Sequence, residues 1–142
     1  MSRILVPFDD SPSAHRALDF AVDLARRLGS TDVHIVTAHD NLIDVTRETA
    51  YQPLDKLLAE QEAHSRKVLQ PALDKAKASG VAASSAILTG SISQSIVDYA
   101  RANACTQIVM GTHGRGTIGT LLLGSIAQKV VHLATMPVTL VK

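Results

Sequence analysis

Five of the eight glycines in this 142-residue chain lie within one short stretch, residues 111–124. The stretch follows directly after an apolar, β-branched run, and it ends just before a segment of helical period at residues 126–134. Glycine lets backbone N–H groups come close to an anion, and the N-terminal end of a helix carries a partial positive charge. These residue types in this order predict a loop that holds phosphate through backbone amides.

Two familiar phosphate-binding motifs match this stretch only in part. Residues 114–119 satisfy G-x-G-x-x-G, but they follow the fourth predicted strand, and no acidic residue stands about 20 positions later to bind a ribose. Residues 119–125 spell G-x-x-x-x-G-S, but the lysine of an ordinary P-loop is missing. The stretch therefore gives only weak support to a dinucleotide-binding motif and to an ordinary P-loop.

Strands and helices alternate along the chain, and this alternation sets where the glycine-rich stretch must lie. The predicted strands are short apolar runs at residues 4–6, 33–37, 86–88, 108–110 and 138–141, with segments of helical period between them. Apolar strands joined by helices form parallel sheets that are covered on both faces. We therefore predict an α/β fold in which residues 1–142 form a single open, doubly wound, parallel five-stranded sheet with helices on both faces, of the Rossmann-like type.

The ends of the predicted helices are partly visible in the sequence. Ser11 is a good N-cap residue and Pro12 suits the first helical position, so together they predict where the first helix begins. Ser91 and Gln94 have capping-box spacing at the start of the third helix. Pro71 removes a backbone donor within the second helix and predicts that this helix is kinked or divided there.

The fold class also predicts where a ligand binds. In open parallel sheets the ligand lies beyond the carboxyl ends of the strands, where the strand order reverses. Residues at these strand ends are therefore candidates for the functional site: residues 7–11, 37–41, 88–91 and 110–116.

The spacing Gly111-x2-Gly114-x9-Gly124-Ser125 resembles the ATP-binding signature of the universal stress protein family. The opening ILVPFDDSPSAHRAL and nearly all of the C-terminal half are similar to the same family, so the resemblance covers the whole chain. It implies a fold of the universal stress protein type and an adenine nucleotide as ligand, with ATP, ADP and AMP, and the presence of Mg²⁺, left open.

The resemblance also implies which residues meet the base and the sugar. Pro7 and Phe8 are expected to line the base pocket, and Ala38 to offer backbone groups to the adenine. Asp9 is expected to contact the ribose or the adenine edge. Asp10 replaces the glycine that the family commonly has there, and we expect its side chain to point to solvent.

A second set of residues is implied for the ribose and the phosphates. Met110 and Gly111 are expected to lie against the ribose, and His113 is a further candidate to hydrogen-bond a phosphate. The phosphates are expected to be surrounded by backbone amides and one hydroxyl, those of Gly114, Arg115, Gly124, Ser125 and Ile126.

Composition restricts the partners. The formal net charge is +1, and aromatic residues make up 3% with no Trp, which argues against nucleic acid as the main partner. No apolar run approaches the roughly 18 residues of a membrane span, and the N-terminus lacks a signal-peptide pattern, so we expect a cytoplasmic protein without a membrane partner. The six histidines show no metal-ligand spacing, so we expect no metal site.

These observations lead to one expected function and two alternatives. We expect an adenine-nucleotide-binding stress-response protein, a homodimer that reports stress or energy state through the irregular segment 39–53. The apolar strand at residues 138–141 is an edge that pairing with a second copy would cover, and the resemblance implies a dimer there. The alternatives are a slow Mg²⁺-dependent ATPase, for which no catalytic residue is recognisable, and a nucleotide-independent chaperone or scaffold.

Overall fold

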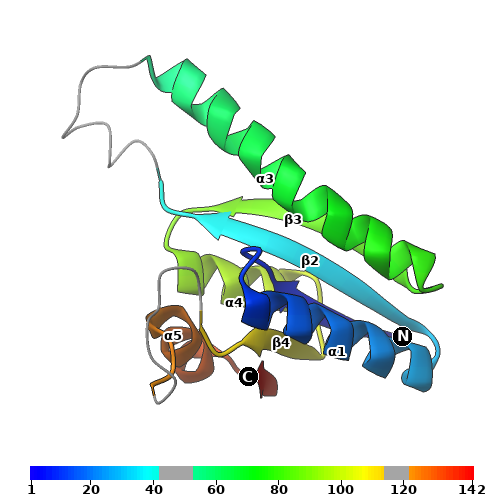
Figure 1. Cartoon of the computed structure of the whole chain (residues 1–142). Coiled ribbons are helices and arrows are strands. Elements are labelled where there is room, and N and C mark those ends of the chain that lie inside the picture. The colour runs from blue at the N-terminus through cyan, green and yellow to red at the C-terminus, as the bar shows by residue number, and fades with distance from the viewer. Residues whose placement is uncertain (42–52, 114–121) are drawn as a thin grey trace.

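The computed structural model describes residues 1–41, 53–113 and 122–142 (Figure 1). Five strands alternate with helices along the chain. The strands are β1 (Ser2–Pro7), β2 (Thr31–His39), β3 (Ala82–Thr89), β4 (Gln107–Gly111) and β5 (Val138–Val141). The helices of the described residues are α1 (Pro12–Leu28), α3 (Leu54–Ala78), α4 (Ile92–Ala102) and α5 (Ser125–Leu133).

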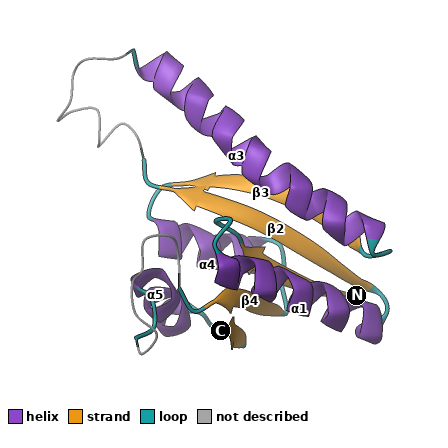
Figure 2. Cartoon of the chain, in the orientation of Figure 1, coloured by secondary structure: helices purple, strands orange, loops and turns teal. Residues whose placement is uncertain are grey.

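The five strands form one parallel sheet in the order β3-β2-β1-β4-β5. The chain runs outward from β1 to β3 and then returns to the other side of β1 to form β4 and β5, so the strand order reverses between β1 and β4. This arrangement confirms the predicted open, doubly wound sheet, and Figure 2 shows the strands between their covering helices. Four of the five strands extend beyond their predicted runs, and β5 has the predicted bounds.

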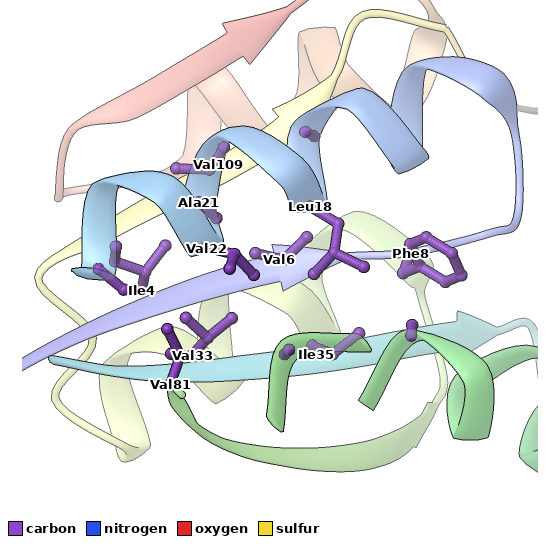
Figure 3. Packing of buried hydrophobic residues seen from close by; sticks show 14 of the residues in the cluster. Ile4, Val6, Phe8, Leu18, Ala21, Val22, Val33, Ile35, Val81 and Val109 are labelled. Carbon is purple, nitrogen blue, oxygen red and sulfur yellow. The ribbon is translucent and has the colours of Figure 1, made fainter. Parts of the chain in front are cut away.

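Two hydrophobic clusters cover the two faces of the sheet. Side chains alternate between faces along a strand, so Ile4 and Val6 of β1 pack with α1 and α3, while Leu5 packs with α4 and α5. Figure 3 shows the first cluster, in which Leu18 of α1 lies over the sheet between Val6 and Phe8. The sheet is therefore buried on both faces, as the continuous apolar strands predict.

Both predicted helix starts are confirmed, but the predicted capping box of α4 is not. Ser11 is the N-cap of α1 and accepts a hydrogen bond from the N–H of Ala14 at 3.2 Å. Ser91 is the N-cap of α4 but its side chain makes no capping hydrogen bond, and Gln94 instead donates to Oδ1 of Asp98 at 2.8 Å. The capping box is therefore wrong, because Gln94 is turned towards the following helical turn and away from the N-cap.

Pro71 lies inside α3, which continues undivided from Leu54 to Ala78. Of the two predicted effects of Pro71, a kink or a division, the division is therefore wrong. The ring stands on the exposed side of α3, so the carbonyl of Lys67 that loses its helical donor lies where water reaches it.

Among the described residues, no helix combines the length and the apolar composition needed to cross a membrane.

Candidate functional site

A cleft of about 380 Å³ lies at the carboxyl ends of β1, β2 and β4, at the point where the strand order reverses. This is the position that the fold class predicts for a ligand. The cleft is bounded by β1 and α1 on one side, by α3 on a second, and by α4 and α5 on the third. Its volume is within the range of small-molecule sites, roughly 300 to 1,000 Å³.

The structure brings together most of the residues that the sequence singles out. The cleft is lined by all of the candidate residues in the described ranges, which are Pro7, Phe8, Asp9, Ala38, Met110, Gly111, His113, Gly124, Ser125 and Ile126. The remaining two candidates, Gly114 and Arg115, lie outside the described residues.

The expectation for residues 88–91 is wrong, because none of them lines the cleft. β3 is the edge strand, and β2 separates it from the point where the strand order reverses, so Gly90 meets only a lining residue, by donating its N–H to the carbonyl of His39 at 3.1 Å. The next helix, α4, reaches the cleft instead through Ile92 and Ile96.

Other lining residues were not among the individually named candidates. They include Thr37 and His39 at the end of β2, which fall within the expected segment 37–41, and His64, Ser65 and Val68 of α3. Nothing in the sequence indicates which turn of a 25-residue helix lies beside the end of β2. The α3 side of the cleft therefore had no sequence signal.

The backbone of Ala38 faces the cleft with both a donor and an acceptor. Phe8 donates its N–H to the carbonyl of Val36 at 2.7 Å, and β1 pairs with β2 no further. Alternate residues of a parallel strand direct their peptide groups to the same side, so Ala38 directs its N–H and C=O to the side that β1 has left. His39 points the other way, since its carbonyl accepts from Gly90 at 3.1 Å.

The N-terminus of α5 forms the opposite wall. Its first intrahelical hydrogen bond runs from the N–H of Gln128 to the carbonyl of Gly124 at 3.0 Å. The N–H groups of Ser125, Ile126 and Ala127 therefore precede any helical acceptor, and these three residues line the cleft. Amides in this position, together with the helix dipole, form an environment that favours an anion.

Hydrogen bonds join the segment that follows β4 to the start of α1 and to the start of α5. Ser13 donates its hydroxyl to the carbonyl of His113 at 2.5 Å, and Thr112 accepts at its carbonyl from the N–H of Gly124 at 2.8 Å. Gly111 lies so close to α1 that a Cβ atom at this position would be 2.8 Å from the carbonyl carbon of Ser13. The absence of a side chain at Gly111 thus allows β4 and α1 to approach.

His113 places an unsatisfied nitrogen in the wall of the cleft. Its Nδ1 lies 2.8 Å from the hydroxyl of Thr112, while its Nε2 is buried and has no hydrogen-bond partner among the described residues. A buried polar atom without a partner costs about 1 to 3 kcal/mol. A ligand group that bonds to Nε2 would recover this cost.

The turn between β1 and α1 carries two acidic residues with different roles. Oδ1 of Asp9 accepts from the N–H of Ser11 at 3.0 Å, and Asp9 also lines the cleft, so it orders the turn as well as facing the site. Asp10 adopts a φ of 66°, and its side chain, 41% exposed, pairs with His15. The expectation that the Asp10 side chain points to solvent agrees with this partial exposure and with its place outside the cleft lining.

Within the described ranges, no group of three His, Cys, Asp or Glu side chains is placed to hold a metal ion.

Comparison with known proteins places the chain in a family. The family model of the universal stress protein family matches residues 1–142. A universal stress protein of Thermus aquaticus, described as lying in the QAH/OAS sulfhydrylase 3′ region, is 34% identical over 146 residues, covering 98% of this chain and 97% of that protein.

Two solved structures show the same fold over nearly the whole chain. Universal stress protein UspA from Lactobacillus plantarum is 26% identical with a TM-score of 0.80, covering 99% of this chain and 97% of its own. The universal stress protein from Archaeoglobus fulgidus in complex with dAMP is 23% identical with a TM-score of 0.69, covering 100% and 98%. The family that the sequence resembles is thereby confirmed, and this chain belongs to the universal stress protein family.

Proposed function

We propose that this protein binds an adenine nucleotide, ATP or its products ADP and AMP, in the cleft between β1, β2 and β4, and that it acts as a nucleotide-regulated module of the stress response. The observation that carries the proposal is the pairing of two complementary walls across one cleft. The peptide groups of Ala38 stand at one side and the open amides of Ser125, Ile126 and Ala127 stand at the other. The dAMP complex of the Archaeoglobus fulgidus relative supports the same ligand class.

The base fits the side formed by β1 and β2. Ala38 offers a donor and an acceptor to the edge of a purine, while Phe8 and Met110, which are 4% and 5% exposed, give the apolar surface that a base buries. The phosphates fit the N-terminus of α5, where amides and dipole favour negative charge. His113 supplies one more nitrogen for a ligand oxygen.

The placement of the phosphates is tested by putting a charge at the first residue of α5. Ser125→Glu adds a carboxylate where the proposal places phosphate, and an acidic residue at a helix N-terminus stabilises the helix, so the variant should fold. We expect its Kd for ATP and AMP, measured by calorimetry, to rise at least about tenfold by charge repulsion. Adenosine, which carries no phosphate, should bind both proteins about equally.

Val131→Glu is the matched control, because it adds the same charge further along α5 at a residue that is 46% exposed and lies outside the cleft lining. We expect this variant to bind nucleotides as the parent does. Mass spectrometry of small molecules released from the denatured parent protein shows which nucleotide it carries. A parent that neither releases nor takes up an adenine nucleotide would contradict the proposal, and it would favour the scaffold function.

A further inference from the structure

The wall of the cleft on the α3 side contains a polar pair that the proposed function does not use. His39 is the last residue of β2, and it lies on the α3 face of the sheet because Ile35, four residues earlier, packs in the cluster with α3. Its Nε2 lies 2.6 Å from Oγ of Ser65, a residue of α3 that is 1% exposed. Both residues line the cleft.

The hydrogen bonds of Ser65 fix which nitrogen of His39 carries the proton. A serine hydroxyl has a single proton, and Ser65 donates it to the carbonyl of Gln61 at 2.9 Å. Ser65 must therefore accept from His39, so Nε2 is the protonated nitrogen. In a neutral imidazole the other nitrogen, Nδ1, then has a free lone pair and is an acceptor.

The surroundings favour this neutral form. Burial lowers the pKa of His39, and the neighbouring His64 lowers it further, whereas Asp40 acts in the opposite direction. The ring is therefore uncharged near neutral pH.

The direction of Nδ1 follows from the shape of the ring. The two nitrogens of an imidazole point in nearly opposite directions, so Nε2 directed at α3 leaves Nδ1 directed away from α3. No described residue forms a hydrogen bond with Nδ1. His39 lines the cleft and follows Ala38 directly, so Nδ1 is the ring nitrogen that remains for a ligand.

Such an acceptor adds to the selectivity of the Ala38 backbone. The peptide N–H and C=O match N1 and the 6-amino group of adenine, and they use only one of the two hydrogens of that amino group, whereas hypoxanthine presents an acceptor and a donor in the reverse order. A side chain that can only accept uses the second amino hydrogen and adds a further penalty against a 6-oxo group, because one lone pair would face another. Sites that leave a polar group unpaired reject the wrong ligand strongly.

We propose that His39 determines base specificity: its Nδ1 accepts a hydrogen bond from the 6-amino group of the purine and so selects adenine over a 6-oxo purine. This inference rests on the proposed function, since it places the base at the Ala38 side of the cleft.

Two substitutions separate the two nitrogens of His39. His39→Gln reaches Ser65 with its side-chain amide, near the position of Nε2, but has no atom in the place of Nδ1. His39→Asn places its amide oxygen near Nδ1 and loses the contact with Ser65. We expect the parent to bind AMP more tightly than IMP, His39→Gln to lower the ratio of the two affinities about tenfold, and His39→Asn to keep most of it.

The pH dependence of the same ratio distinguishes base reading from a purely structural role. A protonated His39 donates at Nδ1, so the AMP preference of the parent should fall as the pH decreases from 8 to 5.5. AMP and IMP carry the same phosphate, so its titration cancels in the ratio. The other titratable groups that face the ring or the cleft are His64 of α3, Asp40, Asp9 and His113, and all of them remain in His39→Gln, whose ratio should stay level.

The outcomes test the two proposals separately. A His39→Gln protein that discriminates AMP from IMP as the parent does, at every pH, would overturn the role of His39 and leave nucleotide binding intact. A parent that binds neither AMP nor ATP would overturn both.

Discussion

Oδ1 of Asp10 lies 2.7 Å from Nε2 of His15, and the backbone of Asp10 itself is in the left-handed region. His15 also meets the ring of Phe8 edge to face, with centroids 5.0 Å apart, and Phe8 lines the cleft. The turn that brings β1 to the site therefore places Asp10 at a φ of 66°, where glycine is the residue of lowest cost, and the pair with His15 offsets part of that cost.

Replacing Asp10 separates the strain from the pairing. Asp10→Ala keeps a Cβ at positive φ and loses the ion pair with His15. Asp10→Gly loses the same ion pair but also relieves the backbone strain. We therefore expect Asp10→Gly to be more stable than Asp10→Ala by about 1 kcal/mol in urea unfolding. Because an exposed pair contributes only about 0 to 1 kcal/mol, Asp10→Gly should lie close to the parent. Equal stability of the two variants would show that the turn relaxes to negative φ.

Gly111 is predicted to serve packing as well as the ligand. A Cβ there would lie 2.8 Å from the carbonyl carbon and 2.9 Å from Cβ of Ser13, and backbone atoms of α1 cannot move away cheaply. We expect Gly111→Ala to lower the free energy of unfolding by about 3 kcal/mol.

Gly80→Ala is the matched control for this prediction. Gly80 has a φ of 79° and open space where a Cβ would stand, so only backbone strain acts, at roughly 1 to 2 kcal/mol. If urea unfolding gave the same loss for both variants, the close approach of β4 to α1 would not be a rigid contact.

The position of the cleft could be predicted from the sequence, but the α3 residues that line it could not. The glycine-rich stretch and the apolar strand runs are local signals, because glycine content and side-chain periodicity can be recognised within a few consecutive residues. His64 and Ser65 reach the cleft only through the packing of α3 on β2, and helical periodicity does not fix that position. The left-handed Asp10 was missed for a related reason: its conformation is imposed by the turn, while aspartate itself prefers negative φ.

His34 is expected to make the fold less stable at acid pH. Burial, and then the charge of Arg3, lower the pKa of His34 from 6.5, while Asp32 opposes them, and Nδ1 of His34 lies 3.1 Å from the hydroxyl of Tyr99. The unfolded chain binds this proton near pH 6.5 and the folded chain only at lower pH. Stability is therefore complete above about pH 6.5 and decreases as the pH falls below it.

The measurement is the free energy of unfolding in urea between pH 8 and pH 5.5. His34→Gln should show a smaller loss over this range than the parent. His39→Gln should also reduce the loss, because burial and then His64 lower the pKa of His39 as well, and the two reductions should add in the double variant. An unchanged loss in His34→Gln would mean that other groups control the acid response.

The edge strand β5 is expected to form the homodimer. The carbonyls of Pro137 and Val141 accept from Ile108 and Thr112 on the β4 side, so the alternate residues, Val138 and Leu140, direct their peptide groups outward. An apolar edge with open peptide groups is stabilised by pairing with a second copy. Leu140→Lys places a charge on this edge, and we expect it to convert a dimer into a monomer by light scattering.

Val131→Lys is the control for the dimer prediction, because it adds the same charge to an apolar residue of α5 that is 46% exposed and lies off the β5 edge. It should leave the dimer intact. Leu140 also packs against the α4 and α5 cluster, so urea unfolding must first show that Leu140→Lys folds. A folded Leu140→Lys protein that remains dimeric would place the interface on another surface. If Leu140→Lys loses the dimer and Val131→Lys keeps it, the interface lies at the β5 edge.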